Sequence, residues 1–453
     1  MGKIDGNYTL TALCAVGAEK ICAQEIRKLN VSALDKTFHV TGTAYGRVNF
    51  QTNLPGIYRA LFALRTADRV LLQCASFDAP DFDALFEGAK GAATETLVPK
   101  NSGVIIGKVR VNRSKLQAAV PIQAMVHKAV AENLCRAYSV SRLPEYGAGF
   151  NAVFRVYLEK DRAELLLDLS GDPLFKRGYR EEGGIAPLRE TTAAALVLAS
   201  GWRRKEALYD PFCGSGTIPV EAALYACNLA PNLGRAFALD ELLIADAETR
   251  REVKENLLQN ANLQAEFNIK GCDSNSALIT TARSNAKKAF FLAGGEAAHT
   301  PLFNALNMED AKAYGPGSGF VITNPPYGRR LGDLAEAEEG YKKMALLRRN
   351  FPGWKIAVIT DSENFESLFG EQASSVSPLT NGAVKTYIYQ FEKKEAAPPK
   401  ETAPYHKKES GPYHPKAYGR PDAGRPQAGT GPENGPKPQT SQRPVKEKKQ
   451  YTW

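Results

Sequence analysis

The chain has 453 residues, of which 43% are apolar, and it carries a formal net charge of +9. This length and composition exclude a small single-domain protein and a wholly disordered chain, and they favour two or three domains with apolar cores. No apolar run reaches the about 18 residues of a membrane-spanning helix, the first residues lack the apolar stretch of a signal peptide, and the cysteines and histidines show no metal-ligand spacing. We therefore expect a cytoplasmic protein without membrane contact and without a metal.

Strands and helices of modest length alternate through roughly the first 165 residues. Alternating apolar residues predict strands, and apolar residues spaced by three and four predict helices. The predicted strands are 8–15, 70–75, 104–111, 154–158 and 163–169, and the predicted helices are 19–29 and 121–138. The segment Lys160-Asp161-Arg162 predicts a turn between the last two strands. The pattern indicates an α+β module with a split β-α-β character.

A glycine-rich turn at 210–217, of sequence DPFCGSGT, joins the short apolar strand 207–209 to the predicted helix 218–227. Strand, glycine turn and helix together predict a cofactor site, because the glycines let a ligand approach the helix N-terminus. The motif GxGxxG and the lysine of a phosphate-binding loop are both absent, which makes NAD and ATP the weaker readings. The candidate cofactor residues in this turn are Asp210, Pro211, Cys213, Gly214, Gly216 and Thr217. We expect Cys213 to act there as a small packing residue rather than as a nucleophile.

A second predicted strand, 267–272, ends at Asp273, and helical spacing follows over 274–290. A carboxylate at the tip of this strand can accept hydrogen bonds from both ribose hydroxyls, in S-adenosylmethionine as readily as in NAD. The segment 230–263 that precedes this strand is longer than a simple crossover requires. It therefore predicts an extra helical insertion.

The apolar run 319–323 predicts a fourth strand, and Asn324-Pro325-Pro326-Tyr327-Gly328 follows it directly. An exocyclic amine on a base is a poor nucleophile, because its lone pair is delocalised into the ring. The Asn324 side-chain carbonyl and the Pro325 backbone carbonyl could accept its two N–H bonds and favour the reactive geometry. Tyr327 offers a flat face for stacking the base. This loop predicts transfer of a methyl group to an amine.

Two further strands complete the predicted sheet. The run 354–360 is nearly continuous in apolar residues and predicts a buried parallel strand, and 384–391 is rich in β-forming residues. We expect the latter to be an antiparallel strand inserted near the edge of the sheet.

These motifs resemble those of the bacterial THUMP-domain ribosomal RNA guanine-N2 methyltransferases, and the similarity extends over most of residues 1–392. The stretches that carry it are KRGYR at 176–180, APLRET at 186–191, the glycine turn, NLAPN at 228–232 with Arg235 and Phe237, and NPPYGRRLG at 324–332. The resemblance implies an α/β fold: a Rossmann-like class I methyltransferase domain preceded by ferredoxin-like and THUMP α+β domains. The implied boundaries are 1–55 for the ferredoxin-like domain, 56–168 for the THUMP domain, 169–190 for a linker, 191–392 for the methyltransferase domain and 393–453 for a disordered tail.

The same resemblance implies a methyl transfer from S-adenosylmethionine to N2 of a guanine in 23S ribosomal RNA of the large-subunit precursor. Such proteins usually carry an acidic residue after the third strand, near the adenine amino group. This chain has Asn304 there, and an amide oxygen can still accept from that amine. Asp273 and Asn304 therefore join the six residues of the glycine turn as candidate cofactor residues.

The positive charge is concentrated at the C-terminal end. Residues 393–453 carry 13 Lys and Arg against 6 Asp and Glu, which leaves a net charge of only +2 for the rest of the chain. If the folded part binds RNA, local clusters of basic residues must therefore make the contacts, since its overall charge is close to zero. The candidates are Arg113, Lys115, Lys176, Arg177, Arg180, Arg329 and Arg330.

The tail from about 393 has 11 of the 27 prolines and almost no aliphatic residues, so it should not fold by itself. Its tyrosines among basic residues suit loose contact with RNA as well as a purely solubilising role, and composition does not separate the two.

Three other activities fit the amine-methylation loop. Transfer RNA guanine-N2 methylation is the nearest alternative, and the loop also occurs in enzymes that methylate N6 of adenine in DNA or N5 of protein glutamine. An inactive RNA-binding assembly factor is the remaining alternative, disfavoured by retention of Asp210, Asp273 and Asn324.

Overall fold

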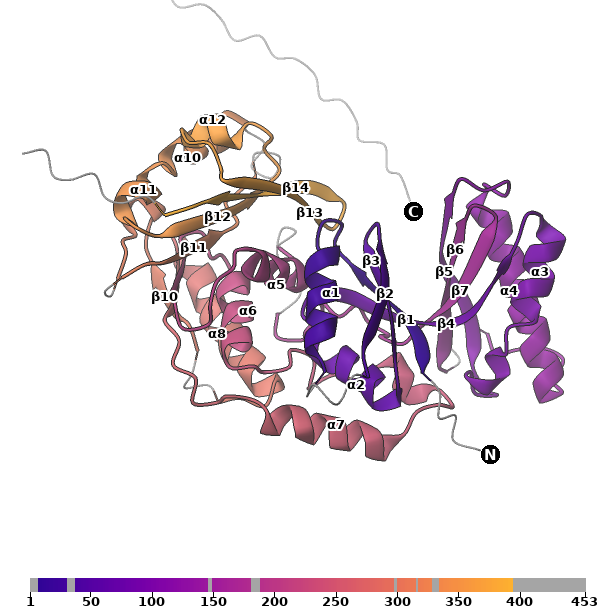
Figure 1. Ribbon diagram of the computed structural model, residues 1–453. Helices are drawn as coiled ribbons and strands as arrows, with labels where there is room; N and C mark the ends of the chain where they lie inside the picture. The colour runs from indigo at the N-terminus through magenta and orange to yellow at the C-terminus, as the bar shows by residue number, and fades with distance from the viewer. Residues whose placement is uncertain are drawn as a thin grey trace, which may run out of the picture. The chain divides into compact units, whose positions relative to one another are not determined.

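The computed structural model describes residues 7–30, 37–145, 149–180, 188–296, 300–314, 317–327 and 334–393. Within these ranges the chain forms two seven-stranded sheets with helices packed against them (Figure 1). The predicted roles of Gly328, Arg329 and Arg330, part of the predicted linker and the predicted tail lie outside the described residues.

The first sheet has the strand order β2-β3-β1-β4-β7-β6-β5. Its strands are β1 (Tyr8–Cys14), β2 (His39–Ala44), β3 (Arg47–Thr52), β4 (Ala67–Asp78), β5 (Gly103–Asn112), β6 (Asn151–Glu159) and β7 (Arg162–Asp168). Its helices are α1 (Glu19–Lys28), α2 (Leu54–Ala63), α3 (Phe82–Lys90) and α4 (Ala119–Tyr138), with the 3-10 turn η1 (Thr94–Thr96). All the strands and helices predicted in this half are confirmed, while β2, β3, α2 and α3 had not been predicted.

A β-α-β-β-α-β order opens the chain and runs from β1 to β4, which is the ferredoxin-like arrangement. It therefore extends past residue 55, where the sequence placed the first boundary, because α2 and β4 complete this unit. The long strand β4 pairs with β1 through its first half and with β7 through its second half. The accessory elements that follow thus continue the same sheet.

The turn between β6 and β7 is a tight hairpin, as predicted. Lys160 and Asp161 both have positive φ, at 52° and 61°. Two successive positive φ values match the type I′ geometry, whose twist suits a two-residue hairpin.

The second sheet has the order β10-β9-β8-β11-β12-β14-β13. Its strands are β8 (Ala207–Asp210), β9 (Ile269–Asp273), β10 (Leu302–Ala305), β11 (Gly319–Thr323), β12 (Lys355–Thr360), β13 (Ser375–Asn381) and β14 (Val384–Phe391). The first five are parallel, and β14 is antiparallel to both β12 and β13. The inserted antiparallel strand is therefore confirmed.

Helices cover both faces of this sheet. On one side lie α5 (Glu190–Ala199), α6 (Thr217–Ala226) and α8 (Ser276–Leu292), and on the other α10 (Leu334–Lys343), α11 (Leu346–Asn350) and α12 (Phe365–Phe369) (Figure 1). Successive strand residues alternate between the two cores: Leu208 and Ile322 belong to the first, and Tyr209 and Val321 to the second. This burial on both faces explains the nearly continuous apolar strands. The predicted insertion holds η2 (Ala238–Glu241) and α7 (Ala247–Gln259), and α7 packs against α2.

Hydrogen bonds join the ferredoxin-like elements to the catalytic half. Asn232 is fully buried, and its side-chain amide donates to the carbonyls of Leu61 and Leu64 at the end of α2, at 3.0 and 3.5 Å. A helix end leaves its last carbonyls without partners, and Asn232 supplies donors for them. A second contact is a backbone hydrogen bond, in which Thr380 N donates to Val16 O at 3.0 Å.

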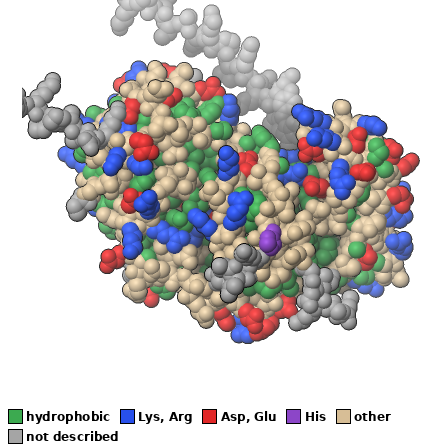
Figure 2. Space-filling model, in the orientation of Figure 1, with side chains coloured by type: hydrophobic (Ala, Val, Ile, Leu, Met, Phe, Trp, Pro, Cys, Tyr) green, Lys and Arg blue, Asp and Glu red, His purple; other side chains and the backbone are tan. Residues whose placement is uncertain are grey.

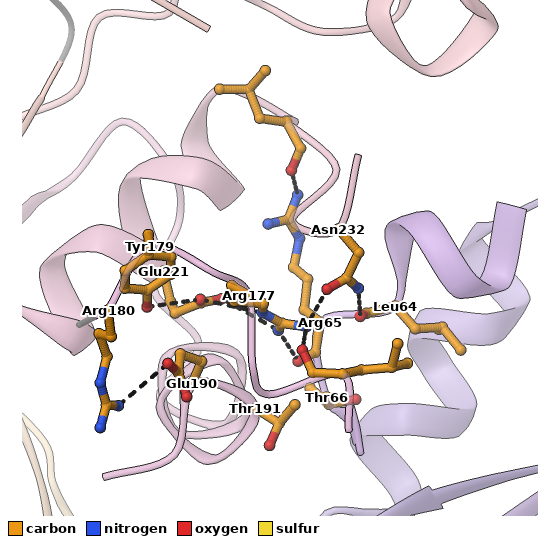
Figure 3. Close-up of polar contacts among 12 residues, drawn as sticks. Leu64, Arg65, Thr66, Arg177, Tyr179, Arg180, Glu190, Thr191, Glu221 and Asn232 are labelled. Carbon is orange, nitrogen blue, oxygen red and sulfur yellow. Dashed lines mark hydrogen bonds and ion pairs between the residues drawn. The ribbon is translucent and has the colours of Figure 1, made fainter. Parts of the chain in front are cut away.

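A buried ion pair lies at the first of these junctions. Arg177 donates to Glu221 of α6 at 3.4 Å, to Asn232 Oδ1 at 3.2 Å and to the Arg65 carbonyl at 2.6 Å (Figure 3). The Tyr179 hydroxyl donates to Glu221 Oε1 at 3.1 Å. The linker stretch KRGYR therefore connects the ferredoxin-like elements to the catalytic half through buried hydrogen bonds.

Candidate active site

The candidate site residues gather at the carboxyl ends of β8, β9 and β11, which are neighbours in the second sheet. Parallel strands all present these ends at one edge, and ligands bind there in open α/β sheets. Asp210 ends β8, Asp273 ends β9 and Asn324 follows β11. The strand pattern of the sequence thus brought the three together correctly.

The glycine turn is shaped by two residues of positive φ, Gly214 at 53° and Gly216 at 84°. A Cβ on Gly216 would lie 3.0 Å from both Ala282 and the Phe303 ring, so only glycine fits without adjustment. Gly216 also caps α6 without a side-chain hydrogen bond, which leaves the N–H groups of the first helical turn available to a ligand. Thr217, the first residue of α6, is buried beside them.

Cys213 packs inside this turn, as expected. Its backbone N–H donates to Cys272 O at 2.9 Å, and a Cβ on Gly271 would lie only 2.8 Å from the Cys213 Cβ. Burial raises the pKa of the Cys213 thiol well above its ordinary value, so the thiolate does not form at neutral pH. Pro211, at the start of the same turn, is also buried.

Asp273 connects the two loops of the candidate cofactor site. Its Oδ2 accepts from Gly214 N at 3.1 Å, and its Oδ1 accepts from Asn275 N at 2.9 Å. Each carboxylate oxygen has further lone-pair capacity, so the pair can still accept from two hydroxyls of a ligand.

Asp210 is almost completely buried, with 1% of its surface exposed. Its Oδ1 accepts from the Thr323 hydroxyl at 2.6 Å and from Phe212 N at 3.1 Å. Burial raises the pKa of this carboxyl to about 7, and these hydrogen bonds oppose the rise. A cation bound at the turn would favour the charged carboxylate.

The loop after β11 is held by tyrosine hydroxyls. Tyr327 donates to Asn324 Oδ1 at 2.6 Å, and Tyr341 of α10 donates to Pro326 O at 3.3 Å. Pro325 is buried, and Tyr327 is 2% exposed. The Asn324 oxygen can accept a second hydrogen bond, so the Tyr327 contact orients this acceptor without consuming it.

A cavity of about 350 Å³ opens beside Tyr327. Apart from Tyr327, its polar lining comes from the loop after β12 and from β14, segments in which the sequence had indicated no site residues. The lining residues with polar side chains are Tyr327, Asp361, Glu363, Lys385 and Tyr387. Its volume falls within the range of about 300–1,000 Å³ for small-ligand sites.

The prediction that Arg177 contacts RNA is wrong. Its side chain is 1% exposed and paired with Glu221, which is 0% exposed. Arg180 is also engaged inside the protein, donating to Leu188 O at 2.8 Å and pairing with Glu190 at 3.4 Å. Sequence reasoning missed Glu221 because its partner lies 44 residues away in the chain. Lys176 is exposed and pairs with Asp172 at 3.6 Å.

The remaining predicted residues lie apart from this site or at its border. Arg113 and Lys115 are exposed at the end of β5, where Lys115 N donates to Asp161 Oδ1. Asn304 is exposed on β10, one residue before the position paired with Asp273. Figure 2 shows Lys and Arg interspersed with Asp and Glu on the visible face, in keeping with the near balance of charge in the described part.

In the described part of the chain, no helix is long and apolar enough to span a bilayer. The same ranges hold no group of three or more His, Cys, Asp and Glu side chains placed to bind a metal ion.

The strand order, the glycine turn and the Asn-Pro-Pro-Tyr loop define a Rossmann-like methyltransferase. Residues 177–390 match the family described as "RMKL-like, methyltransferase domain", and residues 9–71 match the "RlmL ferredoxin-like domain". The chain is 34% identical over 398 residues to "Putative RNA methyltransferase YpsC" of Bacillus subtilis (strain 168), covering 87% of this chain and 98% of that protein. The chain therefore belongs to this family of methyltransferases.

A longer relative is "Ribosomal RNA large subunit methyltransferase K/L" of Syntrophotalea carbinolica, 33% identical over 86% of this chain and 54% of the relative. The chain thus spans about half the length of such relatives. Among solved structures, a possible methylase from Clostridium difficile 630 is 34% identical with a TM-score of 0.77, covering 87% of this chain and all of that one. SMU.472, a putative methyltransferase complexed with SAH, is 30% identical with a TM-score of 0.76, covering 88% and 100%. These likenesses confirm the predicted fold class.

Proposed function

We propose that the protein transfers a methyl group from S-adenosylmethionine to N2 of a guanine in RNA, with 23S ribosomal RNA of the large-subunit precursor as the substrate. The observation that carries the proposal is the convergence of Asp210, Asp273 and the Asn324-Pro325 loop at neighbouring strand ends. The names of the relatives add support, since one is named "Putative RNA methyltransferase" and others are named as methyltransferases of the large-subunit ribosomal RNA.

The residues around the glycine turn fit S-adenosylmethionine, which supplies an electrophilic methyl group when bound. Asp273 has acceptor capacity for two ribose hydroxyls, and the buried carboxyl of Asp210 favours a cationic group beside it. The open N–H groups at the start of α6 suit the carboxylate end of such a ligand. Asn304 at the border of the site is the proposed acceptor for the adenine amine.

Asn324 and Pro325 would act on the acceptor amine. Their two carbonyl oxygens accept its N–H bonds, which favours the geometry in which the nitrogen lone pair is free of the ring. Tyr327 holds the Asn324 oxygen in place through its 2.6 Å hydrogen bond. By holding the amine at the strand ends and excluding water, these residues would supply most of the rate, since proximity effects reach about 7–11 kcal/mol.

The cavity beside Tyr327 favours guanine over adenine. The Watson–Crick edge of guanine presents N1–H and the N2 amine as donors, whereas the corresponding ring nitrogen of adenine is an acceptor. Glu363 Oε1 in this cavity already accepts from Tyr387 at 2.6 Å and from Lys385 at 3.2 Å. Base recognition is therefore assigned to Asp361, whose carboxylate accepts hydrogen bonds only. A flipped guanine would suit Asp361 better than adenine would.

The accessory elements from α3 to β7 are proposed to form a THUMP RNA-binding domain. Arg113 and Lys115 are exposed there, at the free edge strand of the first sheet, where phosphates can reach them. Lys176 would add a contact nearer the catalytic half, and a cytoplasmic location follows from an RNA substrate in a bacterial cell.

One experiment separates the substrates. Purified protein is incubated with radiolabelled S-adenosylmethionine and, in parallel, 23S ribosomal RNA precursor, total transfer RNA and duplex DNA, and the modified base is identified by mass spectrometry. We expect N2-methylguanine in ribosomal RNA, abolished by Asn324→Ala while cofactor affinity on calorimetry stays nearly unchanged. N2-methylguanine in transfer RNA alone would establish the nearest alternative, N6-methyladenine would overturn the guanine assignment, and cofactor binding without product on any substrate would favour an assembly factor.

A further inference from the structure

A second cavity, of about 480 Å³, lies between the ferredoxin-like elements and the catalytic half. Its lining comes from α1 and α2 on one side and from the last turns of α5 and α6 and from α7 on the other. It is separate from the active site, because α6 begins at the glycine turn and only its end, at Tyr225, reaches the cavity. Ten helical residues span roughly 15 Å.

The lining is strongly basic. Four basic residues line the cavity, namely Lys28, Arg59, Arg65 and Arg204, against a single acidic residue, Glu25. The Glu25 carboxylate already accepts from Arg65 N at 2.7 Å, from Thr66 N at 3.1 Å and from the Thr66 hydroxyl at 2.7 Å. These donors are backbone and hydroxyl groups, so Glu25 keeps its charge, and the lining holds four cations against one carboxylate.

Arg65 is the central residue of this lining. It is 7% exposed, and its Nη2 donates to the Leu229 carbonyl (Figure 3). Its Nη1 is buried and has no hydrogen-bond acceptor among the described residues. Leaving a buried charged donor without a partner is costly, and because this atom has almost no accessible surface, an acceptor in the cavity would meet it only after the Arg65 side chain turns.

Arg204 lies close to the same place. The guanidinium groups of Arg204 and Arg65 lie over one aromatic ring, that of Tyr225, at 4.2 and 5.6 Å from its centre. Within the described ranges no carboxylate is ion-paired with either of them. Burial lowers the pKa of Arg65 to about 10, while the Glu25 and Glu221 carboxylates oppose this shift, so Arg65 remains cationic at neutral pH. Arg65 donates to the Leu229 carbonyl and Arg204 to Asn228 Oδ1 at 3.4 Å, which leaves further N–H donors on both guanidinium groups for an anion.

We propose that this cavity is a phosphate-binding site, which takes a phosphate group through Arg65 and Arg204 and thereby joins the ferredoxin-like elements to the catalytic half. Guanidinium groups suit phosphate because their planar donors match its oxygens, and such charge-assisted bonds are among the stronger ones in proteins. Lys28, Arg59 and Arg65 belong to the ferredoxin-like elements and Arg204 to the catalytic half, so a bound phosphate would contact cations from both halves. The phosphate belongs either to a free nucleotide or to the backbone of an RNA.

The test measures affinity with three probes: inorganic phosphate, uridine 5′-monophosphate and a short oligoribonucleotide. Uridine is used because it lacks the adenine that the proposed cofactor site would recognise. Titrations on the full chain by calorimetry and by thermal unfolding are compared with chloride at equal ionic strength. The variant is Arg204→Gln, which changes a partly exposed lining residue, and its matched control is Arg203→Gln, whose exposed side chain lies outside the cavity.

We expect Arg204→Gln to weaken binding by about tenfold or more, the loss of one charge-assisted hydrogen bond, with Arg203→Gln close to wild type. Dependence on Arg204 with phosphate or the mononucleotide identifies a free ligand, and dependence with the oligoribonucleotide alone identifies an RNA backbone. The proposal is overturned if no probe binds beyond the effect of chloride, or if the two variants weaken binding equally. Cofactor affinity should be the same in both variants, so failure here is distinguishable from failure of the proposed methyl transfer.

Discussion

Replacing Arg177 with Met should destabilise the protein far more than its position in an interdomain linker would indicate. The change removes donors to Glu221 at 3.4 Å, to the Leu174 carbonyl at 2.8 Å and to the Arg65 carbonyl at 2.6 Å. Glu221 would remain as a buried charge without its cation. Breaking a buried pair by removing one partner costs about 3–5 kcal/mol, and we expect a loss in this range.

Urea unfolding followed by circular dichroism and tryptophan emission measures this loss as a lower midpoint at unchanged slope. Lys176→Met is the matched control, because its neighbouring side chain is half-exposed and its pairing with Asp172 is that of a surface ion pair, worth about 0–1 kcal/mol. Adding Glu221→Gln to Arg177→Met should recover part of the stability, since it removes the stranded charge and keeps an acceptor for Tyr179. A loss below about 1 kcal/mol in Arg177→Met, or a double variant no more stable than Arg177→Met alone, would refute the reasoning.

Further predictions concern the active site. Asp273→Asn should weaken S-adenosylmethionine binding by about tenfold or more, since the site loses a charged acceptor, and unchanged affinity on calorimetry would remove its ribose role. The Asp210 carboxyl, with its pKa raised to about 7, should release about half a proton when a cationic ligand binds at pH 7. The affinity for that ligand should therefore fall as the pH decreases from 7 to 5. Equal binding heats in buffers of different ionisation enthalpy would contradict this. In the free protein the same raised pKa makes this group contribute stability at low pH that is lost as the pH rises through about 7, and Asp210→Asn should remove that slope in urea titrations. Gly216→Ala should cost more stability than Gly201→Ala, because both have positive φ, a strain of about 1–2 kcal/mol, but only Gly216 lacks room for a Cβ; equal midpoints in urea would count against the crowding argument. Asp361→Asn should reduce guanine methylation while cofactor affinity is kept, and full activity in the radiolabel assay would exclude the carboxylate from base recognition.

The parallel strands and the residues at their ends were predictable from sequence, because buried strands have continuous apolar runs and turn chemistry is local. Asp210, Asp273 and Asn324 each directly end or follow such a run. Strand β2 was not predicted, since its residues are mostly exposed and carry no clear alternation. Arg177 was misassigned because a basic residue reads as a surface residue until its partner is known, and Glu221 is distant in sequence.

The cavity beside Tyr327 also could not be predicted from the local sequence pattern. Its lining combines residues from the loop after β11, the loop after β12 and the first half of β14, and only the insertion of β14 next to β12 brings these segments together. The twofold spacing of a strand predicts which face a residue occupies, but not which other strand lies beside it.

Strand β4 has a consequence for how a target nucleotide would be selected. Since its two halves pair with β1 and with β7, the accessory elements and the ferredoxin-like elements share one rigid strand instead of a hinge. If the proposed function holds, the distance between the bound RNA feature and the methylated guanine would be fixed by the protein. The sequence between the two would not affect which guanine is methylated. Lengthening β4 by two residues, which preserves which side chains face each side, should then move the modified position along the RNA and not abolish modification.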